Sequence, residues 1–163
     1  MAIAGTTRDL TGRRIDFGAL QRVTEVQDEI RLTSTVSRGG YGDRITGLQK
    51  LVQRYTILFL TIQGNVKYAP LQGTNFVDAL NRGIIQTNET VLHQFVFANS
   101  AVNSQLASDD VNPDMGPIAP DDERIASAVL QSFEIDYTNA RLFLQIAITN
   151  LQGETTIFVL PTA

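Results

Sequence analysis

Apolar residues recur at helical spacing in two long stretches of the chain. The first stretch predicts an amphipathic helix over about 45–60, with Asp43 as its N-cap. The second predicts a helix from Thr87 or Asn88 to about residue 106. The two apolar faces comprise Ile45, Leu48, Leu51, Val52, Tyr55, Leu58 and Phe59, and then Val91, Leu92, Phe95, Ala98, Asn99, Val102 and Leu106. A shorter helix is predicted over 75–81, and Gly83 is its expected stop.

The last forty residues change to the two-residue period of β-strands. Within 129–137, one face carries Val129, Phe133, Ile135 and Tyr137, and the other carries Leu130, Ser132, Glu134 and Asp136. Within 140–149, the apolar face is Leu142, Leu144, Ile146 and Ile148. Turns at 138–139 and 150–154 separate these segments from TTIFVLP, residues 155–161. The pattern predicts a three-stranded antiparallel meander whose final strand lies at an edge.

These elements predict an α+β fold, in which two to three helices pack on a small C-terminal antiparallel β-meander. We expect an extended N-terminal arm over 1–44 and a compact domain over 45–163. The glycine-rich segment SRGGYGD, residues 37–43, marks the division. The arm carries Arg8, Arg13 and Arg14, and its basic, glycine-broken character predicts that it clasps a neighbouring subunit.

The segment between the first two predicted helices, TIQGNVKYAPLQGTNF, contains two glycines and a proline but one charge. Gln63-Gly64-Asn65 has the composition of a tight turn, which predicts a short hairpin between 61–62 and 66–68. Pro70 would end the pairing because it has no N–H, and Gly73 permits backbone angles that other residues avoid.

Composition narrows the classes of function. The net charge of −4 divides unequally, with +3 over residues 1–60 and −7 over residues 61–163. The overall acidic balance argues against nucleic acid as a partner, because phosphate binding needs a basic face. The longest apolar run is far shorter than a membrane span, and the first residues lack the apolar core of a signal peptide. We therefore expect a soluble protein that binds neither membrane nor nucleic acid.

The sequence contains little that indicates catalysis, a cofactor or a metal. It has no cysteine, and His93 is the only histidine, so multi-histidine zinc sites are excluded. The acidic loop over 109–123 lacks the spacing of a calcium-binding loop, and no phosphate-binding glycine motif occurs. We expect His93 on a helix surface and a non-enzymatic protein without cofactor.

The segment GLQKLVQRYTILFLTIQGNVKYAPLQGTNF resembles the GPW-type baseplate wedge family of contractile phage tails and related injection machines. Thr61, Gly64, Pro70, Gly73 and Phe76 match the family pattern of helix, glycine turn, proline and helix-opening glycine. The resemblance covers about residues 45–160, because the family also continues with a second helix and a C-terminal meander. Gln72 stands where the family often has an aromatic residue. Asp122-Glu123-Arg124 stands where it often has Glu-Pro-Arg.

The resemblance implies a structural subunit of the virion tail baseplate, assembled in the host cytoplasm and present in six copies per baseplate. It would join other wedge proteins around the tail hub and tube and initiate assembly of the tail sheath. The sheath protein would add strands to the C-terminal sheet. The implied partner-binding residues are Asp122, Glu123, Arg124, Thr156, Ile157, Phe158, Val159 and Leu160.

Two alternatives remain open from the sequence. One is a virion-associated, lysozyme-like peptidoglycan glycosidase, for which Glu123 or Glu134 is the candidate carboxylate. The other is a different ring-forming tail protein, such as a tail terminator, which would assemble as a hexamer by itself.

Overall fold

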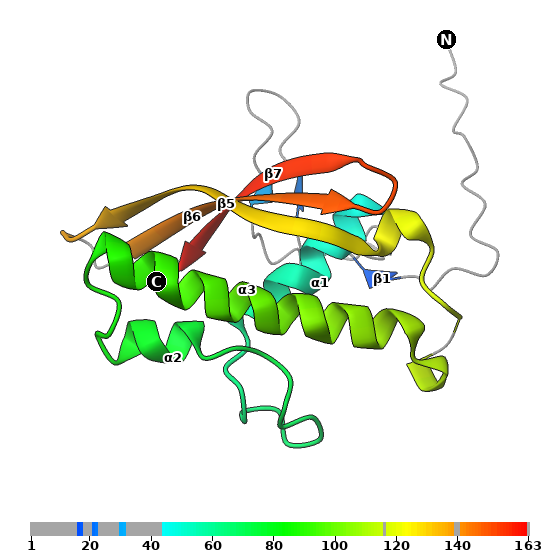
Figure 1. The fold of residues 1–163 in the computed structure, drawn as a ribbon, viewed down its shortest axis with the longest axis horizontal. Coiled ribbons are helices and arrows are strands. Elements are labelled where there is room, and N and C mark those ends of the chain that lie inside the picture. Colours follow the sequence, from blue (N-terminus) through cyan, green and yellow to red (C-terminus); the bar gives the residue numbers. More distant parts are fainter. Residues whose placement is uncertain are drawn as a thin grey trace, which may run out of the picture.

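The structure is a computed structural model that describes residues 16–17, 21–22, 30–31, 44–115, 117–138 and 141–162. It confirms the predicted α+β class. A three-stranded antiparallel sheet forms one layer, and α1 (Leu48–Leu60) and α3 (Asn88–Val111) pack against one of its faces. The short helix α2 (Phe76–Asn81) lies on the side of the helices away from the sheet (Figure 1).

Helix α1 starts later than the sequence predicts. Its N-cap is Gly47, in the left-handed region with φ of 66°, so the prediction of Asp43 as the cap is wrong. The predicted apolar face is confirmed for Leu51, Val52, Tyr55 and Phe59, which are buried. The helix ends where the Thr61 hydroxyl and N–H both donate to the Ile57 carbonyl oxygen.

Helix α3 begins at a capping box whose N-cap is Thr87, one of the two predicted starting residues. The Thr87 hydroxyl accepts from the Thr90 N–H at 3.2 Å, and the Thr90 hydroxyl accepts from the Thr87 N–H at 3.0 Å. Gly83, with φ of 68°, ends α2 as predicted. The apolar face of α3 is confirmed except for Leu92, which is exposed beside Val96 and Phe97 on the outer side of the helix.

The sheet has the order β5–β6–β7, with bounds Ile125–Asp136, Arg141–Asn150 and Thr155–Thr162. All four predicted apolar positions of β6 are buried, and from β7 Phe158 and Leu160 join them. The predicted face of β5 is wrong in its first half. A register shift between Leu130 and Ser132 changes the parity of the strand, so Ala128 faces the core and Val129 is 51% exposed.

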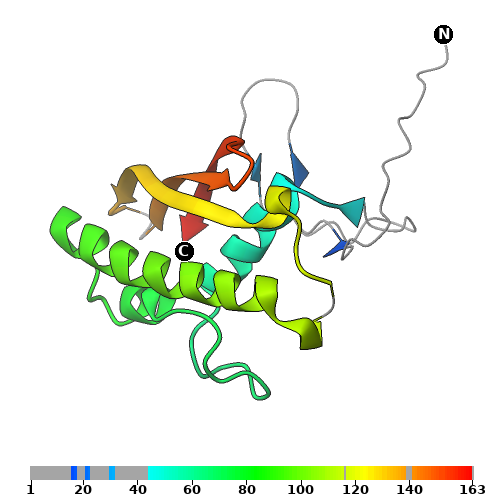
Figure 2. The same ribbon diagram turned by 45° about the vertical axis from the view of Figure 1, so that its right-hand side comes forward.

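Four two-residue strands precede this domain. β1 (Asp16–Phe17) pairs with β4 (Arg44–Ile45), and β2 (Gln21–Arg22) pairs with β3 (Ile30–Arg31), both antiparallel. β3 lies beside β7, as Figures 1 and 2 also show. Most of the predicted arm, including Arg8, Arg13 and Arg14, lies outside the described residues, so its clasping role stays a prediction.

The core joins all the layers through aromatic side chains. Phe59 of α1 lies 4.9 Å from Phe76 of α2 and 5.8 Å from Phe95 of α3, measured between ring centroids. Tyr55 stacks on Phe59 and meets Phe158 of β7 edge-on at 6.2 Å. Such packing makes α1 the central element, because it touches both other helices and the sheet.

The segment between α1 and α2 is an ordered loop and not the predicted hairpin. Ile62 forms an isolated parallel bridge with Thr74, and the Gly64 N–H donates to the Pro70 carbonyl at 3.0 Å. The Thr74 hydroxyl donates to the Phe59 carbonyl at 2.8 Å, which fixes the end of the loop to α1. The loop projects from the lower side of the molecule in Figure 1.

Gly73 holds this loop closed. Its N–H donates to the Gln105 side chain at 2.9 Å, and its carbonyl accepts from the same amide at 2.9 Å. Its φ is 95°, and a Cβ at this position would overlap the Thr61 carbonyl oxygen. Gly64 also has a positive φ, of 91°, but a Cβ there would meet open space.

We expect Gly73→Ala to destabilise the fold more than Gly64→Ala. The Gly64 variant carries only the backbone penalty of positive φ, about 1 kcal/mol. The Gly73 variant adds a clash with backbone, and we expect at least about twice that loss. Urea unfolding followed by circular dichroism measures both. Equal losses would contradict the assignment of Gly73 as the closing residue of the loop.

Candidate functional site

The outer edge of β7 is a candidate site for protein binding. β7 pairs with β6 on one side only, and no strand in the described part of the chain pairs with its other side. Phe158, Leu160 and Thr162 point into the core, whereas Ile157 is 41% exposed on the opposite face. The predicted edge position of the last strand is therefore confirmed for the described residues.

The hydrogen-bond pattern shows which main-chain groups of β7 point outward. The Asn150 N–H donates to the Glu154 carbonyl at 3.0 Å, so these two residues form a hydrogen-bonded pair. Because such pairs alternate with non-bonded pairs along an antiparallel ladder, Thr156, Phe158 and Leu160 bond to β6. The N–H and C=O groups of Thr155, Ile157 and Val159 consequently face away from β6.

Pro161 fits this alternation. It is paired with Phe143 at the next outward-facing position, where a missing N–H removes no bond to β6. The hydroxyl of the following residue, Thr162, donates to the Leu142 carbonyl at 2.8 Å, which holds the end of the strand against β6. The available edge thus comprises three outward N–H groups, those of Thr155, Ile157 and Val159.

Helix α3 contacts the opposite edge of the sheet, along β5, at the carbonyl of Ala128. The Asn99 amide donates to the Ala128 carbonyl at 3.0 Å, and its oxygen accepts from the Tyr55 hydroxyl at 2.9 Å. Burial raises the pKa of Tyr55, so this hydroxyl keeps its proton and remains a donor. The two register shifts in β5 further disturb its edge as a template. The two edges of the sheet therefore differ in regularity, because β7 pairs with β6 without a register shift, whereas β5 has two shifts and a carbonyl bonded by α3.

The tripeptide Asp122-Glu123-Arg124 lies at the start of the sheet, beside the N-terminus of α1. The Glu123 side chain is 1% exposed and accepts from the Lys50 ammonium at 2.8 Å and from the Gly47 N–H at 3.3 Å. Its negative charge therefore lies at the positive end of the helix dipole of α1. Glu123 has an internal structural role, so any partner has to contact this region around an existing ion pair.

The flanking residues are more accessible. Arg124 is partly exposed and pairs with Asp121 at 3.2 Å, while its carbonyl accepts from the Leu151 N–H at 3.0 Å. The Asp122 carbonyl accepts from the Asn150 amide at 3.1 Å. This places the tripeptide against the β6–β7 turn and hence near the start of β7. Partner binding by Asp122, Glu123 and Arg124 stays a prediction.

A second buried ion pair joins α1 to the end of α3. Asp110 accepts from the Arg54 guanidinium at 2.6 Å, and the Asp110 side chain is almost fully buried. The sequence placed this residue in a loop, but α3 continues through Val111. Two acidic residues of the 109–123 segment thus bind basic residues of α1, Asp110 from the end of α3 and Glu123 from just before β5. The spacing of these acids in the sequence does not indicate this role.

The side chains of His93, Glu123 and Glu134 do not lie together as a catalytic group would. His93 is exposed on α3, where its ring meets Phe97 edge-on at 4.7 Å. Glu123 precedes β5 and Glu134 lies near its far end, so about nine strand residues, roughly 30 Å, separate the two carboxylates. That separation is too large for this pair to act on one glycosidic bond.

The described residues contain no group of three or more potential metal ligands. Within the same part of the chain, no helix is both long and apolar enough to span a bilayer. Comparison of the chain with protein families, with curated proteins and with solved structures finds no significant match.

We expect Glu123→Gln to destabilise the protein by about 3 kcal/mol, because it removes the carboxylate that neutralises a buried ammonium. Asp121→Asn is the matched control. It removes one charge from the exposed Arg124–Asp121 pair and should cost less than about 1 kcal/mol. Thermal or urea unfolding measures both variants. Equal stability of the two variants would contradict the structural role of Glu123.

Proposed function

We propose that this protein is a non-enzymatic structural subunit of a contractile-tail baseplate, and that it initiates the tail sheath by accepting a strand on β7. The observation that carries the proposal is the difference between the two sheet edges. β7 presents outward main-chain groups at Thr155, Ile157 and Val159 on a regular strand, whereas β5 has two register shifts and an edge carbonyl, that of Ala128, bonded by α3.

Strand addition suits this edge physically. Main-chain hydrogen bonds supply affinity without special side chains, which agrees with the scarcity of chemical motifs in the sequence. An incoming strand would run antiparallel or parallel to β7 and bond to its outward groups up to Pro161. It has to share this side of the molecule with β3, which lies beside β7.

The family resemblance supports the same role through the loop between α1 and α2. The residues that match the family pattern lie in that loop or at its two ends, and they are Thr61, Gly64, Pro70, Gly73 and Phe76. Phe76 is buried against Phe59, Thr61 ends α1, and the two glycines take positive φ values. In this proposal the motif maintains the fold, and wedge contacts fall to Asp122, Arg124 and the surface around Glu123.

We expect Val159→Pro to abolish binding of the cognate sheath protein while the domain remains folded. Proline removes one outward N–H but no bond to β6, and Pro161 already occupies an equivalent position. Val159→Ala is the matched control, because it shortens the side chain and keeps the N–H. Isothermal titration should give at least about a tenfold weaker affinity for the proline variant only.

Circular dichroism establishes that each variant is folded. Ile157→Pro repeats the measurement at the second outward N–H. Normal sheath binding by folded proline variants would overturn strand addition at β7. A chain ending at Thr155 provides a coarser comparison, because it also removes Phe158 and Leu160 from the core.

A further inference from the structure

Helix α3 has a solvent-facing side without charged residues. Residues 90–108 contain no aspartate, glutamate, lysine or arginine. The exposed positions of this stretch follow the helical period along the side away from the core, and they are Leu92, His93, Val96, Phe97, Ser100, Ser104, Ala107 and Ser108. The solvent-facing side of a helix usually carries charged residues, whereas the centre of a protein interface is depleted of them. This side of α3 therefore has the composition of a contact surface.

The same side divides into a bulky half and a small half. Leu92, Val96 and Phe97 are 49%, 63% and 61% exposed, and they lie within two turns of each other in the first half. In the second half, every exposed position from 98 to 108 is serine or alanine. Small side chains allow another helix to approach closely, and bulky apolar ones need a partner that covers them. Because α3 runs the length of the molecule at its surface, both halves are open to a partner (Figure 1).

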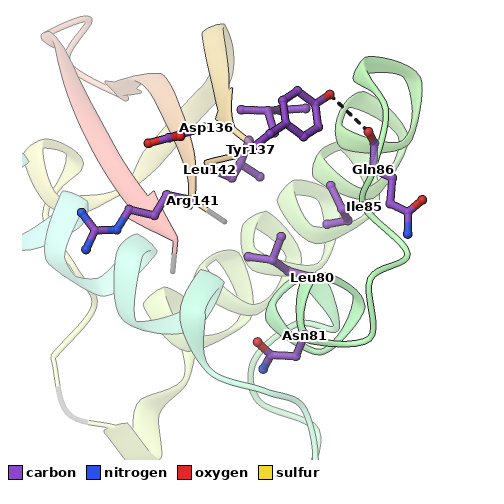
Figure 3. A pocket seen from close by; sticks show the side chains of 9 residues that line it. Leu80, Asn81, Ile85, Gln86, Asp136, Tyr137, Arg141 and Leu142 are labelled. Atoms are coloured by element: carbon purple, nitrogen blue, oxygen red, sulfur yellow. Dashed lines mark hydrogen bonds between the residues drawn. The ribbon is translucent and has the colours of Figure 1, made fainter. Parts of the chain in front are cut away.

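A pocket near the start of α3 differs from this surface in its charges. The pocket has a volume of about 540 Å³ and lies where the turn between α2 and α3 meets the end of the β5–β6 hairpin (Figure 3). Asp136 and Arg141 both line it, and the Tyr137 hydroxyl donates to the Gln86 carbonyl beside it at 3.4 Å. Its charges have both signs, so they indicate no single class of occupant. The uncharged side of α3 does restrict its partner, because a charged partner would lose hydration there without compensation.

We propose that the uncharged side of α3 binds the same side of α3 in a second copy of the chain. The two helices run antiparallel at a small crossing angle, around a two-fold axis at Ser100. This symmetry sets Leu92 of one copy against Ser108 of the other, and Val96 against Ser104. Each bulky side chain thus meets a small one, and each contact occurs twice.

Charge and shape both favour a second copy in this orientation. A two-fold contact between charged surfaces brings like charges together, but the paired span has none, since Glu89 and Asp109 lie beyond its ends. Antiparallel helices also place the positive end of one dipole beside the negative end of the other. A parallel pair would set Val96 against Val96 and Ser104 against Ser104, which crowds one half and leaves the other poorly filled.

The contact closes on itself, so it produces a dimer and no larger species. It is confined to one helix and is smaller than a standard interface, which buries about 800 Å² per partner, so we expect a weak dimer. The inference does not depend on strand addition at β7. That strand lies at the edge of the sheet opposite to β5, which is the strand that α3 contacts.

Sedimentation velocity at protein concentrations up to about 1 mM tests the dimer. The wild type should shift from the 17.9 kDa monomer to a dimer as concentration rises. Val96→Asp should weaken association at least about tenfold, because it places two carboxylates in the apolar contact. Val129→Asp is the matched control, since it puts the same charge at an exposed valine on the face of the sheet away from the core. It should associate as the wild type does.

A compensating charge decides the geometry. Ser104→Lys places an ammonium opposite residue 96 of the second copy, so the double variant V96D/S104K should associate at least about fivefold more tightly than Val96→Asp alone. The two positions are eight residues apart, about 12 Å along one helix, so they do not pair within one copy. Circular dichroism establishes that each variant is folded.

A wild type that stays monomeric up to this concentration would overturn the inference, as would association that Val96→Asp retains. A double variant that associates no more tightly than Val96→Asp would overturn the antiparallel pairing. None of these results changes what is expected of sheath binding at β7, so the two proposals can fail separately.

Discussion

The side-chain amide of Asn99 links the two long helices to the sheet. It accepts from Tyr55 of α1 and donates to Ala128 of β5, so one residue of α3 connects three elements. Buried polar groups need such partners, and loss of one would leave a donor and an acceptor unsatisfied. The contact of α3 with β5 also occupies an edge carbonyl of that strand, whereas β7 has no strand paired with its outer edge in the described part of the chain.

Two buried ion pairs join α1 to the end of α3 and to the start of the sheet. Lys50 and Arg54 lie one turn apart on α1 and bind Glu123 and Asp110, which bracket the segment between α3 and β5. Both charges of such a pair lose their hydration, so the pair adds little net stability, although removal of one partner is costly. The Lys50–Glu123 pair joins α1 to the residues just before β5, and the Arg54–Asp110 pair joins α1 to the end of α3.

The sequence predicted most of the domain because its periodicity is strong. The buried face of β6 and the cap at Thr87 follow from local pattern alone. The failures have local physical causes. A register shift near Gln131 changed the parity of the first half of β5, so Val129 is exposed despite its place in the predicted stripe, and Tyr137 is exposed because it lies beyond the end of the strand. The loop at 61–75 is held by a bond from Thr74 to Phe59 and by a bond from Gly73 to Gln105. Nothing in the local sequence indicates these partners.

The sequence predicted that the candidate site is a strand, but it did not predict which main-chain groups of that strand face outward. Residues 156–160 were identified as one unit, whereas the register separates them into two groups. Thr156, Phe158 and Leu160 bond to β6, and Ile157 and Val159 face outward. Glu123 shows the reverse problem, since the segment predicted as an acidic loop contains a side chain that is buried against Lys50.

Amide hydrogen exchange, resolved by residue, tests strand addition most directly. In the free protein, the amides of Thr156, Phe158 and Leu160 should already exchange slowly, because they bond to β6. Addition of the cognate sheath protein should slow the amides of Ile157 and Val159 specifically. Unchanged exchange at these two amides in a saturated complex, with new protection along β5 or elsewhere, would contradict the account.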